Sequence, residues 1–149
     1  LETLRYEKKE RNRIQMKKNS SVFLDGMKGD HCEIELLVAN TGNHSFGIEV
    51  LCNEEGQDGL RIKINREKNL LEVGDQNGDF TLNPGEPLSL RIFVDACLVE
   101  VFANEKQVVM ADKKRPAGSK IKDCIALFSG ESDLLVDRLS FWKMKSAYK

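Results

Sequence analysis

Apolar and polar residues alternate along most of this chain, and the alternation is clearest between Leu88 and Pro116. The stretch opens with four apolar residues at every second position: Leu88, Leu90, Ile92 and Val94. A period of two residues is typical of a β-strand with one buried face. A second run with the same period ends at Ala103, after a turn at Asp95–Leu98. The pattern therefore predicts a β-hairpin.

The buried faces of this hairpin set the register in which its two strands pair. With Val94 opposite Val99, each further pair also brings apolar side chains together. The predicted pairs are Val94–Val99, Ile92–Val101 and Leu90–Ala103. A slip of one residue would bury Arg91 and Glu100 instead, because neighbouring residues of a strand point to opposite faces.

A third strand is predicted after a second turn at Asn104–Gln107. In this interpretation Ala103 lies opposite Val108, and Val101 lies opposite Met110. One register then satisfies all three strands, and it places the apolar residues of the third strand on the buried face.

The rest of the chain repeats this pattern in short segments. Alternation predicts further strands at 20–24, 32–38, 46–52, 60–64, 70–73, 80–82, 122–129 and 134–144. Turn residues separate these strands: Asp25–Gly26 is predicted to close the first, and Asn77–Gly78 gives the strongest hairpin signal. About ten to twelve strands without a helix predict an all-β fold, a two-sheet antiparallel β-sandwich of the concanavalin or jelly-roll kind.

Charge distinguishes the first eighteen residues from the remainder. Residues 1–18 hold seven basic and three acidic side chains, whereas the whole chain has a net charge of −1. We expect residues 1–18 to be a linker, with an early edge strand. Residues 19–149 are expected to form a single β-sandwich domain. The basic run has no interleaved aromatic residues, so no nucleic acid partner is expected.

The sequence shows neither a membrane segment nor a signal peptide. No apolar run approaches the roughly 20 residues that cross a bilayer, so no membrane partner is expected. The chain begins with Leu1 rather than Met, which is consistent with an excised fragment. The location of the parent protein, secreted or cytoplasmic, therefore stays open.

Residues that bind metals or act as nucleophiles are sparse. His31 and His44 lie beside turns and are expected to be exposed, and the four cysteines lack metal-ligand spacing, which favours free thiols over disulfides. The oxygen-rich segment 75–79 lacks the distal glutamate of a calcium loop. We therefore expect no metal and no cofactor. Trp142, the only tryptophan, is expected in the core.

Asp95 and Glu100 are the best-placed pair of carboxylates, because the predicted register brings both close to the first turn. Two acids beside Arg91 can hold sugar hydroxyls, and these three residues are the candidate sugar-binding residues. Acids near a turn equally often bind backbone N–H groups, and this structural role is the simpler interpretation. No catalytic residue is predicted.

The double hairpin also carries a resemblance to a known family. Segments 93–95 and 99–104 read F-V-D and V-E-V-F-A-N. This resembles the signature of the C-terminal β-sandwich module of family 32 glycoside hydrolases, which are invertases, levanases, inulinases and other fructosidases. Leu1–Arg5 is similar to the junction that follows the catalytic propeller of these enzymes. Segments 125–130 and 139–144 resemble the last two strands of the family module.

The chain departs from the family pattern at two places. The family often has serine where Cys97 stands, and a glycine turn where this chain has Glu105–Lys106. Neither departure changes the expected fold. The family's catalytic residues lie in N-D-P-N, R-D-P and E-C motifs of the propeller, and none of these motifs occurs here.

The resemblance implies a non-catalytic accessory domain that stabilises the catalytic propeller of a fructoside-hydrolysing glycosidase. The implied partner is the propeller of the same parent chain. Help in forming oligomers or in substrate access, and contact with fructan or sucrose-type sugars, stay open. Two alternatives are a fructan-binding carbohydrate-binding module and a free-standing interaction sandwich.

Overall fold

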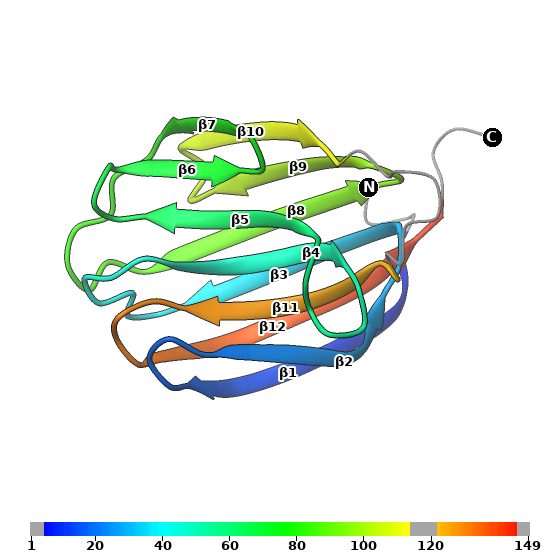
Figure 1. The fold of residues 1–149 in the computed structure, drawn as a ribbon, viewed down its shortest axis with the longest axis horizontal. Coiled ribbons are helices and arrows are strands. Elements are labelled where there is room, and N and C mark those ends of the chain that lie inside the picture. The colour runs from blue at the N-terminus through cyan, green and yellow to red at the C-terminus, as the bar shows by residue number, and fades with distance from the viewer. Residues whose placement is uncertain (1–4, 114–121, 146–149) are drawn as a thin grey trace.

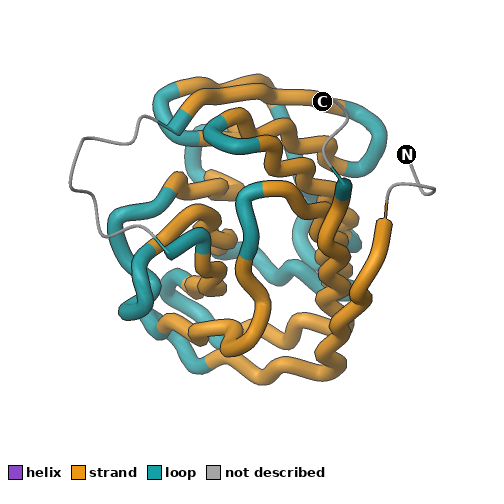
Figure 2. The backbone as a smooth tube through the Cα atoms, turned by 90° about the vertical axis from the view of Figure 1, so that its right-hand side faces the viewer, coloured by secondary structure: helices purple, strands orange, loops and turns teal. Residues whose placement is uncertain are grey.

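The computed structural model describes residues 5–113 and 122–145, which form two antiparallel six-stranded sheets (Figure 1). Figure 2 shows the described chain as strands and loops. Within these residues there is no helix, and so none long and apolar enough to span a membrane. The all-β, two-sheet antiparallel sandwich predicted from the sequence is confirmed.

Six strands form each sheet. Sheet A has the order β1-β12-β3-β8-β9-β10. Its strands are β1 (Arg5–Met16), β3 (His31–Val38), β8 (Leu88–Asp95), β9 (Leu98–Ala103), β10 (Gln107–Asp112) and β12 (Leu134–Met144). Sheet B has the order β2-β11-β4-β5-β6-β7. Its strands are β2 (Ser21–Lys28), β4 (Phe46–Cys52), β5 (Leu60–Asn65), β6 (Leu70–Val73), β7 (Gln76–Asp79) and β11 (Cys124–Ser129).

One large cluster of buried apolar side chains forms the core of the sandwich. Sheet A contributes Ile34, Leu90 and Val101, and sheet B contributes Ile48 and Ile62, all with no exposed surface. Burying a side chain of this kind stabilises the fold by about 1.5–3 kcal/mol. The alternation of apolar residues along each strand is therefore what holds the two sheets together.

The predicted register between β8 and β9 is confirmed. The observed pairs include Leu90–Ala103, Ile92–Val101 and Val94–Val99. On the other side of β8, the partner strand is β3, which is distant in sequence. The hairpin therefore lies inside sheet A, with β10 at the sheet edge.

The register predicted between β9 and β10 is wrong by one residue. The observed pairs include Ala103–Gln107, Val101–Val109 and Val99–Ala111. The turn contains three residues rather than four, and Asn104 holds it: its side chain accepts a hydrogen bond from the Ser89 N–H and donates one to the Pro87 carbonyl. Val108 and Met110, predicted on the buried face, are therefore exposed on the outer face of sheet A.

Residues 5–16 form β1, an edge strand of twelve residues that pairs with β12 along most of its length. The edge strand expected within residues 1–18 is thus an integral part of sheet A. The junction with a catalytic domain stays a prediction. Leu1–Leu4 of the family-like junction and the break expected at Arg115–Gly118 lie outside the described residues.

Two predicted turns lie inside strands. Asp25–Gly26 is part of β2, where Gly26 has a φ of +82° beside a register shift against β11. Asn77–Gly78 is part of β7, and the turn of that hairpin is Gly74–Asp75. Glycine at 78 leaves room for the Gln107 side chain, which crosses from β10 and donates to the Asp79 carbonyl at 2.9 Å. Segment 80–82, predicted as a strand, has no strand structure.

Candidate functional site

The three candidate sugar-binding residues all lie on the outer face of sheet A. Arg91 and Asp95 alternate with buried residues of β8, and Glu100 lies opposite Phe93 on the neighbouring strand β9. Residues opposite each other in a sheet point to the same side. The register predicted for β8 and β9 therefore brings these side chains to one surface, as the sequence indicated.

Arg91 is engaged in an ion-pair network centred on Glu33. The Glu33 carboxylate points outward from β3 yet has no exposed surface, because Arg5 and Arg91 cover it. Arg5 Nε donates to one carboxylate oxygen at 2.8 Å, and Arg91 Nε donates to the other at 3.2 Å. The second oxygen also accepts a hydrogen bond from the Arg5 Nη2. The buried Glu33 carboxylate thus has charge-assisted donors on both of its oxygens.

Trp142 lies beside this network and not in the core. It follows the buried Phe141 in β12, so its ring points to the outer face and is partly buried there. The Arg5 guanidinium lies 4.1 Å from the ring centroid, and the Lys8 ammonium lies 5.4 Å from it. The core position expected for Trp142 is therefore wrong, because the period of two residues places only Phe141 inward. Two cations cover the ring, as in a cation–π contact.

Asp95 is paired with His31, the first residue of β3. The His31 Nε2 lies 3.0 Å from an Asp95 carboxylate oxygen, and the Nδ1 lies 3.0 Å from Asp30. Each ring nitrogen of His31 therefore faces a carboxylate oxygen. The histidine expected to be an exposed loop residue is thus a partly buried strand residue that bridges two acids.

Glu100 differs from the other two candidates, since no hydrogen bond or ion pair reaches it from the described residues. It lies between Phe93 on β8 and Met110 on β10. Phe93 and Phe102 form an edge-to-face pair with ring centroids 5.8 Å apart. The unpaired carboxylate therefore sits on an aromatic and apolar surface.

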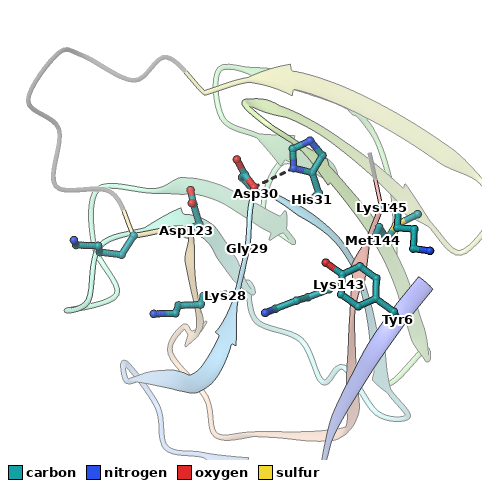
Figure 3. Close-up of a pocket in the computed structure, with 10 residues that line it drawn as sticks. Tyr6, Lys28, Gly29, Asp30, His31, Asp123, Lys143, Met144 and Lys145 are labelled. Atoms are coloured by element: carbon teal, nitrogen blue, oxygen red, sulfur yellow. Dashed lines mark hydrogen bonds and ion pairs between the residues drawn. The ribbon is translucent and has the colours of Figure 1, made fainter. Parts of the chain in front are cut away.

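A cavity of about 550 Å³ opens at the end of the sandwich where β1 begins and β12 ends. Figure 3 shows Tyr6, Lys28, Asp30 and Lys143 around it. Its described lining contains one imidazole, from His31, and neither serine nor cysteine. The described lining therefore offers no serine or cysteine nucleophile beside the His31 imidazole. Among residues 5–113 and 122–145, no three His, Cys, Asp or Glu side chains gather as metal ligands.

All four cysteines, Cys32, Cys52, Cys97 and Cys124, are free thiols. Cys97 is exposed in the turn between β8 and β9, and the other three are buried. Burial raises the pKa of the Cys52 thiol to about 12 and also raises that of Cys32. The buried thiols therefore behave as small apolar side chains rather than as nucleophiles.

Sequence reasoning missed Glu33 and the bridging role of His31. Glu33 has the pattern of an ordinary solvent-facing residue, since Cys32 and Ile34 on either side are buried. Its partners come from β1 and β8, 28 and 58 residues away. The sequence around Glu33 does not indicate this network, because it is the order of the strands in sheet A that brings Arg5, Glu33 and Arg91 together.

Comparison with known proteins identifies relatives of this chain. The family model described as "Glycosyl hydrolases family 32 C terminal" matches residues 1–143. No curated protein sequence matches the chain. Many solved structures share the fold, among them three from enzymes.

A fructosyltransferase from A. japonicus has a TM-score of 0.77 at 15% identity, over 95% of this chain and 27% of that chain. Fructan 1-exohydrolase IIa from Cichorium intybus has a TM-score of 0.73 at 14% identity, over 98% of this chain and 37% of that chain. Sucrose-6-phosphate hydrolase from Lactobacillus gasseri has a TM-score of 0.67 at 21% identity, over 97% of this chain and 29% of that chain. The chain thus spans between about a quarter and two fifths of these proteins.

Proposed function

Because this chain belongs to the family of glycosyl hydrolase family 32 C-terminal domains, we propose that it is the non-catalytic accessory module of a fructoside-hydrolysing enzyme. Its role is to stabilise the catalytic domain of the same polypeptide by packing against it. The observation that carries the proposal is the match over residues 1–143, which together with the coverage of 27–37% leaves most of such a chain outside the module.

The chemistry of the described residues supports a role without catalysis. Glycoside hydrolysis needs two carboxyl groups on either side of the scissile bond, commonly about 5–9 Å apart. On the outer face of sheet A, Glu33 is covered by two arginines and Asp95 is paired with His31. Among Glu33 and the candidate carboxylates Asp95 and Glu100, only Glu100 is unpaired, and a single carboxylate does not supply both an acid and a nucleophile.

Two measurements test this role. The coding sequence upstream of Leu1 is expected to encode a catalytic domain, and its absence would favour a free-standing interaction sandwich. In the full polypeptide, removal of the module is expected to lower the melting temperature of the remaining catalytic domain. An unchanged melting temperature and unchanged fructosidase activity after truncation would refute the stabilising role.

Sugar binding by Arg91, Asp95 and Glu100 stays a prediction, and the unpaired Glu100 beside Phe93 is the observation that favours it. Arg91 and Asp95 would have to bind sugar while held by Glu33 and His31. Calorimetric titration with fructose, levan and inulin tests the prediction directly. Heat that disappears in Glu100→Gln would support a fructan-binding module, and no heat with any of these sugars would exclude it.

A further inference from the structure

Five apolar side chains lie on the outer side of β8, β9 and β10, among the polar residues Ser89, Arg91, Asp95, Glu100 and Asp112. They are Phe93, Leu98, Phe102, Val108 and Met110, which we call the apolar face. Of these, Leu98, Val108 and Met110 are 38%, 48% and 47% exposed. Only one other large hydrophobic side chain of the described residues is exposed, Tyr6 beside the end cavity.

The register brings Val108, Phe102 and Phe93 together, and Leu98 lies beside them between Asp95 and Asp112. Val108 lies opposite Phe102, whose ring meets that of Phe93 edge to face. Met110 lies opposite Glu100, which in turn lies opposite Phe93. Soluble domains rarely expose contiguous apolar surface of this kind without a binding role.

The outer face of sheet B is different in character. Arg61, Lys63 and Glu72 occupy its outward positions on β5 and β6, between buried apolar residues. Arg61 lies with its guanidinium 3.9 Å from the centroid of the Phe128 ring, so a charged group covers the nearest aromatic side chain. None of the exposed large hydrophobic side chains belongs to this face in the described part of the chain. The two faces of the sandwich are therefore not equivalent, since the exposed large hydrophobic side chains of the described residues all belong to sheet A or its turns.

We propose that the apolar face is the surface by which the module packs against the catalytic domain of its own polypeptide. This inference rests on the proposed function and adds the contact surface to it. The residues match the centre of a protein interface, which is enriched in aromatic residues, Met and Arg and poor in Lys. Arg91 and Glu100 supply the polar groups that fix the orientation of the partner.

The catalytic domain fits this surface better than other occupants. In the three enzymes, the matching region covers 27–37% of the chain, so 63–73% of the chain lies outside that region. For a C-terminal domain this remainder lies upstream of β1, and Arg5 in β1 already extends over sheet A to Glu33. Glu33 also binds Arg91, so the ion-pair network runs from β1 to the border of the apolar face. A small sugar would leave Leu98, Val108 and Met110 in water.

Thiol labelling of the full polypeptide tests the surface directly. In a Cys97→Ser background, Val108→Cys or Met110→Cys places a probe on the apolar face. Arg61→Cys is the matched control on sheet B, and Tyr6→Cys probes the end cavity. Labelling of each peptide with iodoacetamide is followed by mass spectrometry in the native protein. We expect the thiols at 108 and 110 to react at least about tenfold more slowly than the thiol at 61, since the centre of an interface excludes water.

Three outcomes would overturn the proposal, each with a different meaning. If the thiol at 61 or 6 is shielded instead, the module packs on its catalytic domain by another surface and the proposed function survives. If all four positions react at the rate of a free thiol, none of these three surfaces is buried and the proposal fails, and the melting temperature after truncation then decides whether the proposed function fails as well. If shielding at 108 disappears on dilution while light scattering shows the mass halving, the occupant is a second copy of the chain.

Discussion

Aspartate placed at Val109 and at Val108 distinguishes the observed register of β10 from one shifted by a residue. Val109 is 7% exposed and lies opposite Val101, whereas Val108 is 48% exposed and lies opposite Phe102. The two residues are neighbours of the same type, and both substitutions add one negative charge. Any difference between the variants therefore reports the face to which each side chain points.

The magnitude follows from burial. Val109→Asp loses the burial of a valine side chain, about 1.5–3 kcal/mol, and places a carboxyl group without a partner among apolar side chains, about 1–3 kcal/mol more. The expected loss in the free energy of unfolding is roughly 3–6 kcal/mol, which lowers the melting temperature by roughly 6–24 °C for a domain of this size. Val108→Asp is a surface change and is expected to shift the melting temperature by at most about 2 °C.

Circular dichroism melts of the two variants and of the unmodified chain, at one pH and one salt concentration, provide the measurement. A Val109 variant that is already unfolded at 25 °C meets the expectation at its upper limit. If Val108→Asp were the more destabilising change, the turn would contain four residues and the pairing of Val109 with Val101 would be wrong. Equal effects would show that β10 is not packed on the core at all.

Three further predictions concern the isolated chain. It is expected to release no glucose from sucrose in a coupled assay, because its sequence contains none of the N-D-P-N, R-D-P and E-C motifs that carry the family's catalytic residues; measurable cleavage would contradict the accessory role. Iodoacetamide at pH 8 is expected to modify Cys97 rapidly and the three buried thiols slowly, since burial raises the pKa of Cys52 to about 12; peptide mapping that shows equal rates would contradict the buried positions. Ser140 donates to Glu10 at 3.0 Å, and this hydrogen bond lowers the pKa of Glu10 below its ordinary value of 4.5. The stabilisation by Glu10 is therefore present above pH 4.5 and lost as the pH falls below it. Because Ser140→Ala removes this hydrogen bond, the melting temperature of the variant should fall less on acidification below pH 4.5 than that of the unmodified chain.

The sequence pattern was sufficient to predict the pairing register where two strands are neighbours in the chain and their buried residues are apolar. For β8 and β9, a short turn and alternating side chains leave one register that buries only apolar residues. The same reasoning failed one turn later, since Asn104 and Glu105 adopt positive φ and shorten the loop to three residues. Because residues 108 and 109 are both valine, either register would place a valine on the buried face. The exposure of Val108 therefore had to come from the structure.

In the candidate site too, the sequence predicted the arrangement within one hairpin but not the partners from a distant strand. The pattern placed Arg91, Asp95 and Glu100 on one face, because all three belong to one hairpin. It did not show that Arg91 is bound to Glu33 or that Asp95 is bound to His31, because those partners lie on β3. Strand order in a sandwich depends on long-range pairing, which a period of two residues does not specify.

The two halves of sheet A satisfy their outward groups in different ways, and this difference argues for a partner on one of them. Across β1, β12 and β3, charged groups meet within the module: Arg5 and Arg91 cover Glu33, and Arg138 pairs with Glu35 at 3.2 Å. Such a surface gains little from a partner, because its charges are already paired. Across β9 and β10, Glu100 and Asp112 are the charged outward side chains, and the others are apolar: Leu98, Phe102, Val108 and Met110. Burial of those side chains against a second surface stabilises the assembly by roughly 25 cal/mol per Å² of apolar area removed from water. In the proposed assembly, the free-energy gain from docking is therefore concentrated on β10, the strand whose register was predicted wrongly from the sequence.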